Sequence, residues 1–173
     1  DNITSITPGA LRGGINSVDK HPVDNNVVVG GSDGAPQLFQ IFRTSARKIG
    51  DNANLIRKHA ELPGRIFAVR VSADGKRFVA GSALNGAGAV AIYSLSSESD
   101  QPAEIKAIRA KDPQQRNGEE NKKLNDYNEQ FVKPLARVDL SQSTVYAVSI
   151  NKDGSLAAAA GSDGLIRILD HEG

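Results

Sequence analysis

The strongest constraint on the fold of this chain is an internal repeat. Three segments share one order of features: a β-rich run, a turn built on Asp, a run of small apolar residues, and then Gly-Ser. A further apolar run follows each copy. A repeat of this kind indicates equivalent units that bury their apolar faces against one another. The copies lie near residues 15–43, 66–95 and 145–170.

Each copy predicts a meander of short antiparallel strands. Asp74-Gly75 and Asp153-Gly154 tolerate the positive φ angles of tight hairpin turns, and Asp24-Asn25 is a weaker version of the same turn. The 17 glycines favour an all-β protein with many tight turns. In the predicted alignment the equivalent Gly-Ser pairs are Gly31-Ser32, Gly81-Ser82 and Gly161-Ser162.

These segments resemble the WD-repeat family, whose repeats form the blades of β-propellers. Val71 to Ser82 looks like the first two strands of such a repeat, and Ser162 to Asp170 looks like its second and third strands. His59 falls where the family has the His of its Gly-His pair. The resemblance implies an all-β fold of four-stranded antiparallel propeller blades across residues 1–173, with a small helical insertion.

The sequence departs from the family pattern at the position of the Trp-Asp dipeptide. Phe39, Tyr93 and Leu169 stand in place of the Trp. Only the second copy has the His, and its next turn has Asn85 in place of the Asp, so no blade has a complete His-Asp-Ser-Trp network. Apolar stacking between blades is therefore expected to hold the array together. His59 is expected to be structural, bonded to the backbone or to Ser82.

Two further segments carry a narrower resemblance. Leu11 to Pro22 and Ala53 to Lys58 look similar to propellers of large exported bacterial proteins that also contain a c-type cytochrome domain. This resemblance implies an exported, periplasmic protein. The chain has no Cys and therefore no Cys-x-x-Cys-His haem site of its own.

An insertion at 96–134 separates the second and third copies. Asp100 is expected to cap a first helix, with Pro102 in its first turn. A second helix is expected to start at Asn117 and to stop before Pro134. Two interpretations are open: a helical hairpin laid on the side of the propeller, or a docking arm for a partner.

No arrangement of residues indicates a catalytic, metal or cofactor site. The three His residues are far apart and lack metal-ligand spacing, and the Gly-rich stretches precede β-type sequence rather than the helix of a phosphate loop. Asp74, Asp153 and Asp163 occupy repeated turn positions, which turn chemistry explains. We therefore expect a protein that is not an enzyme.

One cluster of basic residues stands out in a chain whose net charge is only +1. It is either a solvated rim or a contact for an acidic protein partner. Balanced charge and the lack of interleaved aromatic residues argue against nucleic acid, and no apolar run is long enough to insert into a membrane. The cluster comprises Arg43, Arg47, Lys48, Arg57 and Lys58.

The function expected from these features is a non-catalytic scaffold that binds protein partners through propeller faces and loops. The alternative is an accessory propeller domain of a larger exported redox or hydrolytic enzyme. Three repeats are too few for a closed propeller, which has about 4–8 blades. The third repeat ends at its third strand, whereas Ile3 to Leu11 stands where an outer strand belongs. The missing blades are expected from a longer parent chain or from a homodimer that closes a six-bladed ring.

Overall fold

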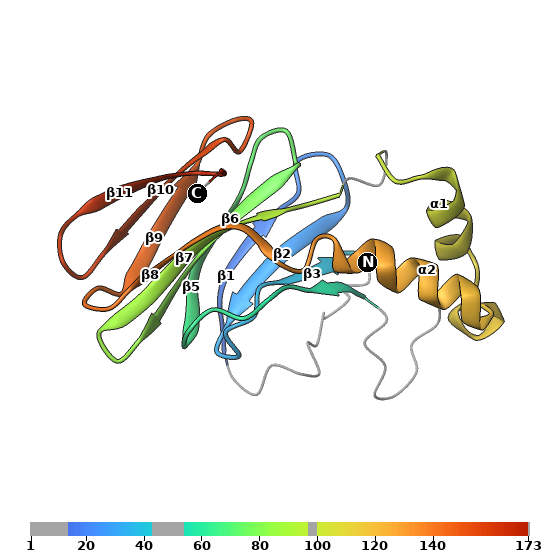
Figure 1. Cartoon of the computed structure of the whole chain (residues 1–173), viewed down its shortest axis with the longest axis horizontal. Helices are drawn as coiled ribbons and strands as arrows, with labels where there is room; N and C mark the ends of the chain where they lie inside the picture. The colour runs from blue at the N-terminus through green and yellow to red at the C-terminus, as the bar shows by residue number, and fades with distance from the viewer. Residues whose placement is uncertain (1–13, 43–53, 97–99, 173) are drawn as a thin grey trace.

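The computed structural model describes residues 14–42, 54–96 and 100–172. These residues form three antiparallel sheets that lie side by side, with two helices at the side opposite β11 (Figure 1). The predicted all-β fold with a small helical insertion is confirmed. Ile3 to Leu11, the expected outer strand, lies outside the described residues.

The three sheets are consecutive blades, each built as a meander. The first has the order β1-β2-β3-β4, the second β5-β6-β7-β8, and the third β9-β10-β11. Outer strands therefore complete the first two blades, and among the described residues the third has none. The strands are β1 Ile15–Lys20, β2 Asn26–Gly31, β3 Gln37–Gln40, β4 Leu55–Lys58, β5 Arg65–Val71, β6 Arg77–Leu84, β7 Ala87–Ser94, β8 Pro134–Leu140, β9 Val145–Ile150, β10 Leu156–Gly161 and β11 Ile166–Asp170.

Two apolar cores lie between neighbouring blades. The first joins Val28 and Leu38 to Ile66, Val69 and Phe78, and the second packs Val79, Val90 and Ile92 against the third sheet. Close approach between blades requires glycine. A Cβ on Gly30 would lie 2.3 Å from Ile66 Cγ2, and a Cβ on Gly81 would lie 2.4 Å from Val145 Cγ1. Gly30 and Gly81 are thus equivalent points where β2 and β6 meet the next inner strand.

Strand pairing corrects the predicted alignment of the repeats by one residue. The register pairs are Ile15 with Gly31, Ile66 with Ser82, and Val145 with Gly161. Ser82 is therefore equivalent to Gly31 and Gly161 rather than to Ser32 and Ser162. The residues at these positions are all small, so the sequence pattern fits either alignment and only the strand pairing fixes the register. Beyond Ser82, a tight turn at Asn85 (φ 49°) and Gly86 (φ 85°) joins β6 to β7.

The insertion contains helices α1 (Ala103–Ala110) and α2 (Gly118–Glu129), joined by a short 3₁₀ turn at Pro113–Gln115. Asn117 caps α2 in a reciprocal capping box with Glu120, so the predicted start is confirmed. The predicted cap at Asp100 is wrong. Pro102 takes the N-cap position with an extended backbone (ψ 145°), so the helix begins only at Ala103. The Pro102 ring has no acceptor atom and makes no side-chain cap bond.

The insertion is tied to the blades by a few contacts around the end of α2. None of the residues of α2 is buried. An ion pair between Lys123 and Glu104 joins α2 to α1, and one between Glu120 and Lys111 joins α2 to the residue after α1. Beyond the helix, the Ala60 amide donates to the carbonyl of Val132 at 2.8 Å. These contacts match a helical hairpin laid on the side of the blades.

Candidate interaction surfaces

The predicted basic cluster divides into three parts in the structure. Arg43, Arg47 and Lys48 lie outside the described residues. Lys58 is exposed on β4 and forms an ion pair with Glu61 at 3.0 Å. Arg57 is only 4% exposed, so the prediction that it faces a partner on the open surface is corrected. Neighbours in a strand point to opposite sides, and β4 turns Arg57 inward where Lys58 points out.

Arg57 lies beneath the C-terminal part of the insertion. Its Nη2 donates to Asn128 Oδ1 at 3.1 Å, and its guanidinium carbon lies 4.5 Å from the centre of the Phe131 ring. Burial, and then the charge of Arg109, lowers the pKa of Arg57 to about 10. Arg57 therefore remains a cation at neutral pH.

His59 occupies a buried aromatic cluster between the first and second blades. Its ring centre lies 4.8 Å from that of Phe78 and 5.3 Å from that of Tyr93, both in edge-on geometry. Nδ1 lies 2.9 Å from the carbonyl oxygen of Phe131, and a carbonyl can only accept, so Nδ1 carries the proton. Burial, and then the charge of Arg57, lowers the pKa of His59 to about 3. His59 is therefore neutral and packed into the core.

Ser82 is not the partner of His59. Its hydroxyl bonds across the β6–β7 ladder, where it accepts from the Ala89 amide at 3.1 Å. Tyr93, which stands in the Trp place, donates its hydroxyl to the carbonyl of Ala60 at 2.9 Å and stacks on Phe78. Two partners were expected for His59, the backbone and Ser82. The ring bonds to the backbone, at the carbonyl of Phe131 in the insertion.

The repeated carboxylates make turn bonds. Asp74 accepts from the Lys76 amide at 3.0 Å, and Asp153 accepts from the Ser155 amide at 3.1 Å. Asp163 accepts from the Leu165 amide and pairs with Arg167, and these hydrogen bonds hold the pKa of Asp163 well below its usual range. Each carboxylate thus accepts a backbone bond within its own turn, and Asp163 is bonded to Arg167 of β11 as well.

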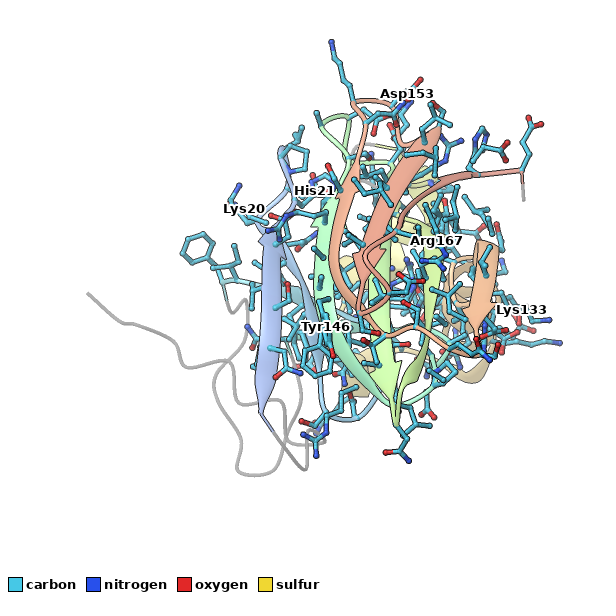
Figure 2. The ribbon with its side chains drawn as sticks, turned by 90° about the vertical axis from the view of Figure 1, so that its left-hand side faces the viewer. Lys20, His21, Lys133, Tyr146, Asp153 and Arg167 are labelled. Carbon is cyan, nitrogen blue, oxygen red and sulfur yellow. The ribbon has the colours of Figure 1, made fainter. Side chains whose placement is uncertain are left out.

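The turns between the first two strands of each blade also link neighbouring blades. His21 accepts the Asp24 amide at Nδ1 (2.8 Å), so its Nε2 proton points to the carbonyl of Gly75 in the second blade (2.9 Å). Arg77 donates in the same way to the carbonyl of Asp153 in the third blade (2.8 Å). Figure 2 shows His21 and Asp153 at the same end of the molecule. His21 was not singled out by its sequence position, because its partner is 54 residues away.

An aromatic pair is exposed on adjacent inner strands. Phe67 of β5 and Tyr146 of β9 are 36% and 54% exposed, and their rings meet edge-on with centres 5.7 Å apart. Exposed aromatic side chains on a rigid sheet are typical of protein-binding surfaces. Sequence reasoning did not single out this pair, because strand register across two blades brings the residues together.

The outer face of the third sheet is apolar, and none of the described residues covers it (Figure 2, toward the viewer). Ile166 and Ile168 of β11 are 74% and 65% exposed. Strand register shows which residues of the other two blades are equivalent to Ile168. Ile168 pairs with Ala158 in the third sheet, just as Leu38 pairs with Val28 in the first and Ile92 pairs with Val79 in the second. Leu38 and Ile92 are buried against the next blade. In each of the first two blades, the next blade covers this surface. The equivalent surface of the third sheet is exposed among the described residues.

The described part of the chain has a groove that lies in the helical insertion rather than on the blades. This groove of about 300 Å³ between α1 and α2 is lined by charged side chains, among them Glu104, Lys111 and Lys123. No group of three His, Asp or Glu residues in the described ranges is placed to hold a metal ion. None of the helices described is long and apolar enough to span a membrane.

Comparison with known proteins agrees with this geometry. Residues 133–170 match the family model described as WD domain, G-beta repeat. The chain carries a WD repeat. The match covers β8 to β11, in which the outer strand of one blade is followed by the three strands of the next. No curated protein matches the sequence.

A similar solved structure is that of Saccharomyces cerevisiae Sqt1, a WD-repeat propeller protein. Its identity to this chain is 10% and the TM-score is 0.56 over 91% of this chain. The likeness supports the propeller-blade fold. The chain spans 32% of the length of the Sqt1 chain. Neither comparison bears on the resemblance to cytochrome-containing bacterial proteins, which stays a prediction.

Proposed function

We propose that this protein is a non-catalytic scaffold that binds protein partners through exposed surfaces of its WD-repeat blades. WD propellers are typically non-catalytic interaction modules. The observation that carries the proposal is the exposed pair of Phe67 and Tyr146, because it presents two aromatic rings on a rigid sheet. We propose that an acidic partner binds a second, basic surface. This surface would comprise Lys58 together with Arg43, Arg47 and Lys48.

Selection from a random peptide library tests the aromatic surface. The wild-type protein should enrich a family of peptides that the double variant Phe67→Ala, Tyr146→Ala no longer binds. Val23→Ala is the matched control, since Val23 is exposed (73%) but lies in the turn between β1 and β2 and has no part in the aromatic contact. Equal enrichment by wild type and the double variant would contradict this surface. Robust turnover in a screen of hydrolase and redox substrates would contradict the non-catalytic assignment.

We propose further that another WD blade covers the outer face of the third sheet. A second copy of this chain would do so in a six-bladed homodimer, and a following segment of a longer parent chain would do so in a single ring. Exposed Ile166 and Ile168, at positions buried in the preceding blades, support both versions. An accessory role in a larger exported redox or hydrolytic enzyme corresponds to the second version.

Light scattering on the isolated chain tests closure. A homodimer has twice the 18.3 kDa mass of the chain, and Ile168→Lys should dissociate it while Val23→Lys should not. If the blades belong to a longer chain, the isolated segment should self-associate irregularly through its open face. A stable, well-folded monomer at micromolar concentration would contradict both versions.

A further inference from the structure

A buried cation lies at the contact between the insertion and the first blade. Arg57 is 4% exposed; one face of its guanidinium lies over the Phe131 ring, and among the described residues its Nη2 donates to the neutral Asn128 amide oxygen, at 3.1 Å. Its Nε and Nη1 are fully enclosed and have no hydrogen-bond partner among the described residues. Buried ionised groups in proteins are normally paired, and each unmatched one calls for an explanation.

A second guanidinium converges on the same oxygen. Arg109 of α1 donates its Nη2 to Asn128 Oδ1 at 2.8 Å. Arg109 is half-buried and has other polar interactions, so the unmatched N–H groups that define the site are those of Arg57. Both guanidinium groups thus contact the same neutral oxygen. Their mutual repulsion is one of the causes that lower the pKa of Arg57.

We propose that Arg57 and Arg109, together with Asn128, bind an oxyanion between the helical insertion and the first blade. A guanidinium presents parallel N–H groups that match two oxygens of a phosphate, sulfate or carboxylate group. Arg109 is only half-buried, so the contact is not sealed from solvent on the side of α1. The bound anion would accept from the unmatched N–H groups of Arg57 and strengthen the attachment of α2 to β4. No partner protein is required for this site.

Thermal unfolding tests the site with inorganic phosphate as the probe. An anion that binds the folded protein raises its Tm, and sodium chloride at equal ionic strength measures the effect of screening alone. Phosphate should raise the Tm of the wild type above the chloride value. Arg57→Gln should abolish this difference, whereas Arg137→Gln, which removes an arginine paired with Asp139 on the surface, should keep it. Sodium acetate in a parallel series shows whether a carboxylate suffices or a tetrahedral anion is needed.

Asn128→Asp gives a second test that does not depend on the folding of Arg57→Gln. The variant places a carboxylate oxygen where both guanidinium groups already converge. Its Tm should exceed that of the wild type by about 3 °C, and phosphate should no longer add to it. An equal phosphate response in wild type and Arg57→Gln would overturn the proposal. So would an Asn128→Asp variant with an unchanged or lowered Tm and a retained phosphate response.

Discussion

The neutral state of buried His59 leads to a quantitative pH dependence of stability. Its pKa is about 3 in the folded protein, against an ordinary value of about 6.5. Between these two values the unfolded chain binds a proton at His59 and the folded chain does not. Acidification therefore favours the unfolded state: the stabilisation is complete above about pH 6.5 and is lost as the pH falls toward 3.

The size of the effect follows from the two pKa values. Between pH 7.5 and pH 5, proton uptake at His59 in the unfolded chain should lower the free energy of unfolding by about 2 kcal/mol. Other titrating groups also change stability over this range, so the wild type must be compared with a variant that lacks only this imidazole. His59→Gln is suitable, because its amide N–H can still donate toward the Phe131 carbonyl.

Urea unfolding at the two pH values measures the difference. The chain has three Tyr and no Trp, so tyrosine fluorescence or circular dichroism reports the transition. The wild type should lose about 2 kcal/mol more than His59→Gln on going from pH 7.5 to pH 5. His171→Gln is the matched control and should retain the wild-type loss, because it leaves His59 intact. Equal losses in wild type and His59→Gln would refute the inference that His59 is buried and neutral.

Three further outcomes are expected. Gly81→Ala should destabilise the protein to urea by about 1–3 kcal/mol, because the added Cβ would lie 2.4 Å from Val145 Cγ1; an unchanged midpoint would contradict this close packing of the blades. Asn117→Ala should weaken α2 by about 1 kcal/mol through loss of its capping box, seen as reduced helical circular dichroism; an unaltered spectrum would speak against the cap. Replacement of residues 97–133 by a short Gly/Ser linker should preserve the β-type spectrum, since loop length costs little, but should lower the Tm because Arg57 and His59 lose their contacts; a chain that no longer folds would show that the helices are integral.

Local chemistry in the sequence was sufficient to predict the repeated β architecture. Gly75 and Gly154 adopt φ angles of 73° and 72° in the turns after Asp, as the Asp-Gly pairs predict. The start of α2 was equally predictable, because a capping box involves only residues three positions apart. These features depend on neighbours in the chain, so the sequence alone contains the information needed to find them.

The tertiary structure decided which polar residues are exposed. Arg57 and Lys58 are adjacent in one basic run, yet only Arg57 is covered, because α2 returns to β4 from 71 residues further along the chain. The Phe131 carbonyl reaches His59 from 72 residues away, and His21 meets Gly75 across 54. The one-residue shift at Ser82 could be found only from the β5–β6 pairing, since a repeat pattern with small residues fits two registers almost equally. Side-chain burial depends on packing between distant segments, which no local pattern in the sequence specifies.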